Sequence, residues 1–306
     1  MKYVVSGYIG FDNFGDEAIQ SVLTKKLKLE GAEKITLISS NPGKTAKLYG
    51  VDSCPMLKFL PPILESDVLI SGGGSLLQDV TSIKSLLYYL AVIYTALILG
   101  KKVQIYAQGI GPINSKIGQF LTKFALKNAD KITVRDKKSQ ELLQSWGIKS
   151  ELVNDPIFDI DVPQINNKGV VGVQLREFEG VSEEFLDKLA DEICKRFSDK
   201  KIIVLSLQDR YDLKVCKNFS EKLINRGIND IEILKDLSIN DVLNTISGME
   251  YLVAMRFHAN VIGIKSGVKT LAINYDPKVE KLAQEYNLPF INLGDNDFSN
   301  QFERLF

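Results

Sequence analysis

Short runs of apolar and β-branched residues alternate with helical patterns along the whole chain of 306 residues. This alternation is typical of parallel sheets built from βαβ units, because a helix usually carries the chain from one parallel strand to the next. The expected strands of the first half are Tyr3–Ser6, Lys34–Ile38, Asp67–Ser71, Val103–Ala107 and Lys131–Val134. Those of the second half are Gly169–Leu175, Lys201–Leu205, Ile231–Leu234, Tyr251–Ala254 and Thr270–Asn274. The halves match in count and order, so the sequence predicts an α/β fold with two parallel sheets.

The length of the chain fits two domains, since a domain usually has about 100–200 residues. Between the two halves lies DPIFDIDVPQINNKG, whose prolines, aspartates and asparagines break the periodicity. We therefore expect the boundary near Asp155–Lys168, with one domain at residues 1–160 and the other at residues 161–306.

Charge and cysteine usage exclude several classes of protein. Lys plus Arg and Asp plus Glu both number 38, so no overall field favours nucleic acid or an anionic membrane, and any anion site must be local. Cys54, Cys194 and Cys216 show no C-x-x-C spacing, which argues against a zinc site or a disulfide framework. The N-terminus, MKYVVSG, is a short strand leading into a glycine turn and does not resemble a secretory signal. We expect a cytoplasmic protein.

The most apolar stretch is Leu86–Gly100, LLYYLAVIYTALILG. It is shorter than the roughly 20 residues that a membrane span needs, so we predict a buried helix. The alternative is a helix that also touches the inner face of a membrane, where a lipid-linked substrate would be found. Against that alternative, the stretch lacks a strong basic face.

Ligands of open parallel sheets bind beyond the carboxyl ends of the strands. In this sequence, glycines and polar or charged residues suited to ligand binding follow the expected strands. In the first half these residues are Gly7–Asp16, Gly72–Gly74, Gln108–Pro112 and Arg135–Asp136. In the second half they are Arg176, Gln208–Arg210, Arg256–His258 and Tyr275–Lys278. Two such edges facing one another would form a cleft between the domains that is rich in glycine and cations.

The first glycine-containing segment, SGYIGFDNFGDEAIQ, follows the first expected strand and begins a helix with Asp16 and Glu17 in its first turn. Its glycines do not form G-x-G-x-x-G, and no acidic residue clearly follows the second strand, which argues against a dinucleotide dehydrogenase. Gly10 and Asn13 would let a sugar or phosphate approach the backbone. The alternative is a structural strand-to-helix turn.

Two further features of the first half suggest anion binding. SGGGSLLQD places Gly72, Gly73 and Gly74 between a strand and an expected helix, where backbone N–H groups can face an anion. A tight turn without ligand is the alternative, and a P-loop is excluded because G-K-[ST] is absent. Arg135 ends a strand and would project into the cleft, with Asp136 as helix cap. The alternative for Arg135 is a surface position or an acidic partner.

The second half contains the strongest group of site candidates, in MEYLVAMRFHANVIGIKSGVKTLAINYDPKVEKL. Arg256 and His258 leave one strand together, and the helix after them can point its N-terminus at the same anion. After the next strand, Lys278 starts a helix, where it opposes the helix dipole unless an anionic ligand is bound. The alternatives are a structural histidine and a solvated lysine.

Several motifs in this order resemble the polysaccharide pyruvyl transferase family, of the type that pyruvylates N-acetylmannosamine in bacterial secondary cell-wall polymers. The motifs run from Tyr8 to Val279 and cover nearly the whole chain: GYIGFDNFGDEAI, DVLISGGGSLLQD, YAQGIGPI, ITVRDKKSQELL, VAMRFHA and INYDPKV. The resemblance implies two Rossmann-like domains in a glycosyltransferase-B-like (GT-B-like) arrangement. It also implies phosphoenolpyruvate as donor and a cyclic ketal across two sugar hydroxyls as product, with the acceptor on the first domain and the donor on the second.

The resemblance also implies roles for individual residues. Arg256 and His258 match the family's Arg-x-His donor site, and Lys278 matches the lysine of its Tyr-Asp-Pro-Lys turn. Arg135 is a further donor-binding candidate. The other expected substrate-binding residues are Gly10, Asn13, Asp16, Gly72, Gly73, Gly74, Gln108 and Tyr275. The sequence departs from the family at Phe257, where leucine is common, and at Ile9, where tyrosine is common.

The chemistry of the reaction accounts for these residue types. Phosphoenolpyruvate carries a carboxylate and a phosphate, which suit arginine, lysine and helix N-termini. Ketal formation needs proton transfers, and His258, the sole histidine, is the expected general acid/base. Asp16, Glu17 and Asp79 are second candidates for proton transfer or, alternatively, caps and surface acids. No cofactor and no metal is required, and the sequence has no His/Cys/Asp cluster.

Two other functions compete with this hypothesis. A GT-B nucleotide-sugar glycosyltransferase has the same two-domain arrangement, and Arg256, His258 and Lys278 could bind a diphosphate instead. A non-catalytic sugar-binding protein is the third hypothesis. Such a protein would not need a group that titrates near neutrality beside three cations.

Overall fold

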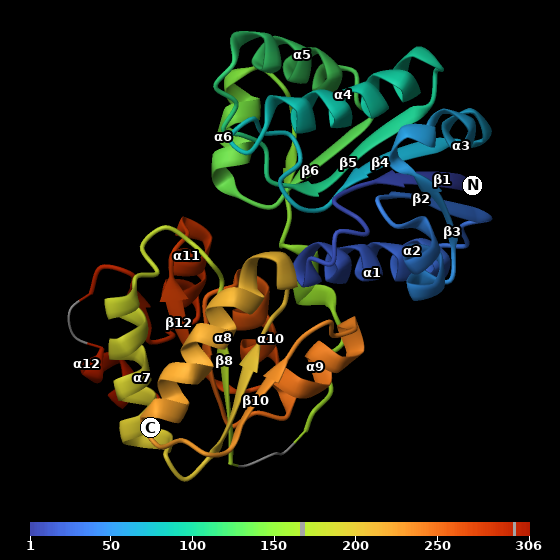
Figure 1. Ribbon diagram of the computed structural model, residues 1–306. Coiled ribbons are helices and arrows are strands. Elements are labelled where there is room, and N and C mark those ends of the chain that lie inside the picture. The colour runs from blue at the N-terminus through green and yellow to red at the C-terminus, as the bar shows by residue number, and fades with distance from the viewer. Residues whose placement is uncertain (166–168, 296–297) are drawn as a thin grey trace. The chain divides into compact units, whose positions relative to one another are not determined.

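The computed structural model describes residues 1–165, 169–295 and 298–306. The chain divides into two compact units, Met1–Ile160 and Asp161–Phe306. The end of the expected linker, residues 166–168, lies outside the described residues. Each unit contains one parallel sheet with helices packed against it (Figure 1).

The first unit has a seven-stranded parallel sheet in the order β3-β2-β1-β4-β5-β6-β7. Its strands are β1 (Lys2–Ser6), β2 (Lys34–Ser39), β3 (Asp52–Pro55), β4 (Val68–Gly72), β5 (Lys102–Gln108), β6 (Lys131–Val134) and β7 (Glu151–Leu152). Its helices are α1 (Phe14–Leu29), α2 (Pro42–Tyr49), α3 (Leu60–Glu65), α4 (Ile83–Ile98), α5 (Lys116–Lys127) and α6 (Lys137–Ser145), with short 3₁₀ turns η1 (Met56–Lys58) and η2 (Pro156–Asp159). In Figure 1, α1 and α2 lie on one side of this sheet, and α4 and α5 lie on the other.

The second unit has a six-stranded parallel sheet in the order β10-β9-β8-β11-β12-β13. Its strands are β8 (Val170–Gln174), β9 (Lys201–Leu205), β10 (Ile231–Leu234), β11 (Tyr251–Ala254), β12 (Lys269–Asn274) and β13 (Phe290–Asn292). Its helices are α7 (Glu183–Phe197), α8 (Asp209–Asn225), α9 (Ile239–Ser247), α10 (Phe257–Lys265), α11 (Pro277–Glu285) and α12 (Ser299–Glu303).

Both sheets reverse their strand order at an equivalent place. In the first sheet the reversal lies between β1 and β4, which pair in parallel with Ser6 opposite Ser71. In the second sheet it lies between β8 and β11, where Gln174 is opposite Ala254. The chain therefore leaves these paired strands toward opposite sides of the sheet, and in open parallel sheets ligands bind beyond the carboxyl ends of such strands. The predicted α/β fold with two parallel sheets is confirmed.

The prediction of five strands in each half is wrong, because the structure adds β3, β7 and β13. All three lie at the edge of a sheet, where a strand pairs on one side only. Both residues of β7 are exposed, and β3 has no buried residue. Strands so short and exposed leave too little apolar periodicity in the sequence to be recognised.

The apolar stretch predicted as a buried helix forms α4, with Ser82 as its N-cap. One face of α4 is buried, and its Leu86, Leu90 and Ile93 are almost completely inaccessible to solvent. Burial of such a side chain contributes roughly 1.5–3 kcal/mol to stability. The opposite face is open, however, with Leu87 43% exposed and Ile98 82% exposed. The prediction of burial thus holds for one face only.

None of the helices in the described part of the chain combines the length and the apolarity that crossing a bilayer requires.

Candidate functional site

Arg256 is the N-cap residue of α10 and lies directly beyond the carboxyl end of β11. Its guanidinium is paired in two places with Asp212, a fully buried residue of α8. Nε donates to Oδ2 over 2.8 Å, and Nη2 donates to Oδ1 over 2.6 Å. Nη2 also donates to Oε1 of Gln208 over 3.2 Å. These bonds fix the plane of the guanidinium and do not use Nη1.

The carboxylate of Asp212 is held by the backbone as well as by Arg256. Its Oδ2 accepts the backbone N–H groups of Leu207 and Gln208 over 3.0 and 3.1 Å. Gln174, the last residue of β8, accepts the backbone N–H of Arg256 over 2.8 Å. The network therefore joins the ends of β8, β9 and β11. A buried pair needs such additional bonds to offset the cost of removing both charges from water.

His258 is the second residue of α10 and is half-buried. Its ring meets that of Phe257 edge-on, with 5.3 Å between centroids and 87° between planes. Phe257 and Tyr275 both pack against the small apolar cluster of Ala272, Val279 and Ala283. This packing fixes the start of α10 beside the turn after β12. His258 thus lies where the partial positive charge of a helix N-terminus favours an anion.

Lys278 lies in the first turn of α11, as the sequence predicts, and it is exposed. Asp276 caps this helix, because its side chain accepts the backbone N–H of Lys278 over 2.8 Å. The cap fixes the backbone at this lysine.

Arg176, two residues after β8, is among the residues that follow the predicted strands, but no role in the site was predicted for it from the sequence. Its guanidinium carbon lies 5.5 Å from the ring centroid of Tyr275 and 5.9 Å from that of Tyr211. Its backbone N–H contacts Sδ of Met255, the residue before Arg256, over 3.3 Å. Its buried Nε has no hydrogen-bond partner among the described residues. A second arginine therefore stands at the place where the strand order of this sheet reverses.

Arg135 of the first unit follows β6 and forms a buried pair with Asp155. Nη1 and Oδ2 of these residues are 2.5 Å apart, and Nη2 donates to the hydroxyl of Ser75 over 3.2 Å. The structure thus shows the acidic partner that was the alternative for this arginine. Asp136 caps α6 as predicted, accepting the backbone N–H of Ser139. Arg135 connects the loop after β6 with the residue that follows the three glycines.

The three glycines Gly72, Gly73 and Gly74 do not lead directly into a helix, so that prediction is wrong. The next helix, α4, begins only at Ile83, and the intervening Leu76 and Leu77 are buried in the core. The backbone N–H of Gly73 donates to the carbonyl of Tyr106 over 3.0 Å. Gly73 and Gly74 have φ values of +71° and +69°. The positive φ values explain why glycines occupy this turn. The N–H of Gly73 already donates to Tyr106, so it is not available to an anion.

The loop after β1 is held by α1 itself. Asn13 is the N-cap of α1, accepting from Gly15 and donating to Asp16 over 2.6 Å. The backbone N–H of Gly10 donates to Glu17 over 2.7 Å. Asp16 also lies against Gly74, since a Cβ atom there would be 2.6 Å from its Oδ1. The structure thereby brings together predicted residues from the loops after β1 and β4.

Glu17 and Asp79, the other acidic candidates, have structural partners. Glu17 is buried and also accepts from the hydroxyl of Tyr49, and its burial raises the pKa of the carboxyl. Asp79 accepts the backbone N–H groups of Asn114 and Ser115, both over 2.8 Å, which lower its pKa. Both carboxylates therefore bind groups of the protein itself, which favours the structural alternative over a role in proton transfer.

Gln108 ends β5 and is fully buried. Its Nε2 donates to the hydroxyl of Ser71 in β4 over 2.8 Å. Its Oε1 has no hydrogen-bond partner among the described residues. This acceptor lies at the same edge of the sheet as Arg135 and Ser75.

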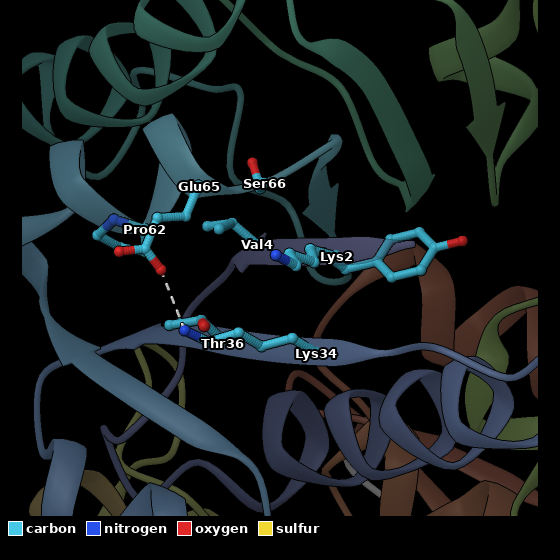
Figure 2. Close-up of a pocket in the computed structure, with 8 residues that line it drawn as sticks. Lys2, Val4, Lys34, Thr36, Pro62, Glu65 and Ser66 are labelled. Atoms are coloured by element: carbon cyan, nitrogen blue, oxygen red, sulfur yellow. Dashed lines mark hydrogen bonds and ion pairs between the residues drawn. The ribbon is translucent and has the colours of Figure 1, made fainter.

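Figure 2 shows a small hollow lined in part by Lys2, Val4, Lys34, Thr36 and Glu65. Nζ of Lys34 and Oε2 of Glu65 pair over 3.1 Å at its rim. The hollow lies at the amino ends of β1 and β2, the end of the strands opposite the predicted site residues. None of those residues lines it, so we do not assign it to the candidate site.

The profile of the polysaccharide pyruvyl transferase family matches residues 13–277 of this chain. No curated protein sequence matches it significantly.

Solved structures share the fold at low sequence identity. UDP-bound MnaA of S. aureus gives a TM-score of 0.67 at 11% identity, covering 99% of this chain and 87% of that one. UDP-GlcNAc 2-epimerase of Neisseria meningitidis gives 0.63 at 11% identity, with 99% and 90% covered. Anabaena HepE in complex with UDP-glucose gives 0.60 at 12% identity, with 100% and 88% covered. The fold is therefore GT-B-like.

Proposed function

This chain belongs to the polysaccharide pyruvyl transferase family, and we propose that it transfers a pyruvyl group from phosphoenolpyruvate to a cell-surface polysaccharide or its lipid-linked precursor. The acceptor we propose is a sugar of the N-acetylmannosamine type. The observation that carries the proposal is the placement of Arg256 and His258 at the start of α10, with the arginine locked in orientation by Asp212.

The reaction we propose forms a cyclic ketal and releases phosphate. Carbon 2 of phosphoenolpyruvate forms bonds to two oxygens of the sugar, and its bond to the phosphate oxygen breaks. Carbon 3 gains one proton and becomes a methyl group. The two sugar hydroxyls supply two protons, of which one balances the proton gained by carbon 3 and the other leaves with phosphate. No oxidant or reductant is needed.

Donor binding is assigned to the second unit. Nη1 of Arg256 is the nitrogen that the bonds to Asp212 and Gln208 do not use, so it can donate to a carboxylate or a phosphate. Lys278 adds an exposed cation after the neighbouring strand. His258, at the N-terminus of a helix, is the group we propose for proton transfer.

The first unit is assigned to the acceptor. Asp16 and Asn13 offer carboxylate and carbonyl oxygens at the carboxyl edge of its sheet, which suit sugar hydroxyls. Gln108 is proposed with them, although its Oε1 is enclosed at this edge. The glycines at positions 72–74 are buried, and we propose that their turn brings Asp16 to this edge, because a Cβ atom at Gly74 would displace it. Arg135 is proposed as a further donor-binding residue, although its pair with Asp155 already offsets its charge.

The experiment that tests the proposal supplies the protein with phosphoenolpyruvate and a panel of sugar acceptors. We expect phosphate release together with an acceptor product heavier by one pyruvyl ketal. In a parallel reaction, UDP- and GDP-sugars replace phosphoenolpyruvate. Consumption of a nucleotide sugar with phosphoenolpyruvate untouched would contradict the proposal and support a GT-B glycosyltransferase. That second candidate is kept because a solved structure of similar fold holds UDP-glucose.

A further inference from the structure

The outer face of α4 carries an apolar stripe that is largely exposed in the described structure. Ile83, Leu87 and Ile98 are 40%, 43% and 82% exposed. Together with Ala91 and Tyr94 they recur at helical spacing, so they lie on one side of the helix. A stripe of this length on the surface usually marks a binding face.

Helix α5 continues this stripe. Ile117, Phe120 and Phe124 are 72%, 69% and 53% exposed and stand three and four residues apart along the helix. The ring of Phe124 stacks on that of Tyr94, with centroids 6.1 Å apart. The hydroxyl of Tyr94 donates to the carbonyl of Leu121 over 2.8 Å. The two helices run side by side on one face of the sheet in Figure 1, so their stripes form one surface, which we call the α4–α5 face.

The charge of this region is one-sided. No aspartate or glutamate occurs between Asp79 and Asp130, while the same stretch contains Lys84, Lys101, Lys102, Lys116, Lys123 and Lys127. The chain as a whole has a formal net charge of zero, so this concentration of lysine is local. Lys116, Lys123 and Lys127 recur along one side of α5, next to its apolar stripe. The basic face that is missing from α4 is therefore supplied by its neighbour.

We infer that the α4–α5 face docks onto a membrane surface that carries anionic lipids. An amphipathic face with exposed phenylalanine beside lysine is suited to lie in the headgroup region, with the rings inserted and the ammonium groups at the lipid phosphates. Lysine stems reach from an apolar surface to such charges. A second copy of the chain fits less well, because a two-fold contact would bring the same lysines together. The inference deepens the proposed function, since an enzyme held at a membrane meets a lipid-linked acceptor.

Cosedimentation of the full chain with lipid vesicles tests the inference. We expect binding to vesicles of phosphatidylcholine with phosphatidylglycerol and little binding to phosphatidylcholine alone. The double variant Phe120→Ser/Phe124→Ser should bind the anionic vesicles at least about tenfold more weakly. The triple variant Lys116→Glu/Lys123→Glu/Lys127→Glu should lose binding too. Circular dichroism checks that each variant is folded.

Matched controls alter exposed apolar residues elsewhere. Leu29→Ser/Ile224→Ser removes two such side chains from α1 and α8 and should leave vesicle binding unchanged. Absence of binding to anionic vesicles, or equal losses in control and test variants, would overturn the inference. So would a dimer, seen by sedimentation velocity, that Phe120→Ser/Phe124→Ser dissociates. Activity on a water-soluble acceptor should survive in this variant, so failure of vesicle binding is distinguishable from failure of the proposed reaction.

Discussion

The carboxylate of Asp212 accepts hydrogen bonds from both Nε and Nη2 of Arg256, over 2.8 and 2.6 Å, although the two residues are 44 positions apart in the chain. The same carboxylate accepts two backbone N–H groups at the start of α8. Asp212 is thus a positioning residue, which orients the guanidinium and compensates its charge. The direction in which Nη1 of Arg256 points depends on it.

The first prediction concerns removal of this carboxylate. Asp212→Ala leaves a buried arginine without its counter-charge, so the free energy of unfolding should fall by about 3–5 kcal/mol. Urea denaturation of the full chain, followed by circular dichroism, measures the loss. Glu221→Ala, at an exposed position of the same helix, is the matched control and should change stability by less than about 0.5 kcal/mol. Similar stability of the two variants would show that the pair is not structurally important.

The second prediction concerns Arg176, whose guanidinium carbon lies 5.9 and 5.5 Å from the ring centroids of Tyr211 and Tyr275. If its guanidinium contacts the anionic donor, Arg176→Gln should raise KM for phosphoenolpyruvate about 10–100-fold, the effect of losing a hydrogen bond to a charged group. The KM for the acceptor should change little. Steady-state kinetics with each substrate varied in turn separates these effects. An unchanged KM for phosphoenolpyruvate would exclude Arg176 from donor binding.

The third prediction concerns Gly10 in the loop after β1. A Cβ atom at this position would lie 2.2 Å from Oγ of Ser39 and 2.7 Å from the backbone nitrogen of Asn41, at a φ of +81°. Gly31 has a similar φ of +78° and open space around it, which makes Gly31→Ala the control for backbone strain alone. Gly10→Ala should be the more destabilising substitution, by about 1–3 kcal/mol in thermal or urea unfolding. Equal losses would mean that the close packing is easily relieved.

The fourth prediction concerns pH and the buried carboxyl of Glu17. Burial raises its pKa in the folded protein above the ordinary value of 4.5, so the folded state binds more protons between the two values. Stability contributed by this group is therefore present below pH 4.5 and is lost as the pH rises through the folded pKa. Glu17→Gln removes this titration. The stability of the natural protein minus that of Glu17→Gln should decrease over this window in denaturation curves, and a difference that rises with pH would contradict the assignment.

The fold was largely predictable because strongly apolar central strands leave a clear pattern in the sequence. The edge strands β3, β7 and β13 were missed because they pair on one side and bury little. The helix expected after the glycines at positions 72–74 begins only at Ile83. The segment between them is not helical, although its Leu76 and Leu77 are buried in the core.

The candidate site was predictable only in part. The positions of Arg256, His258 and Lys278 follow from the rule that ligands bind beyond the carboxyl ends of parallel strands. The ion pair of Arg256 with Asp212 could not be predicted from the sequence, because Asp212 lies within a helix and belongs to no recognisable motif. For Arg135 an acidic partner was one of the alternatives, but its identity, Asp155 from the segment after β7, could not be derived from the sequence.

His258 is central to the account, since it is the only histidine and stands at the start of α10 beside Arg256. The most direct test is the rate of phosphate release from phosphoenolpyruvate in the presence of acceptor, compared between the natural protein and His258→Ala. The account predicts a loss of about 10²–10⁴-fold in kcat, the range typical of a general acid/base, with the circular dichroism spectrum unchanged. A folded His258→Ala variant that releases phosphate at nearly the natural rate would contradict it.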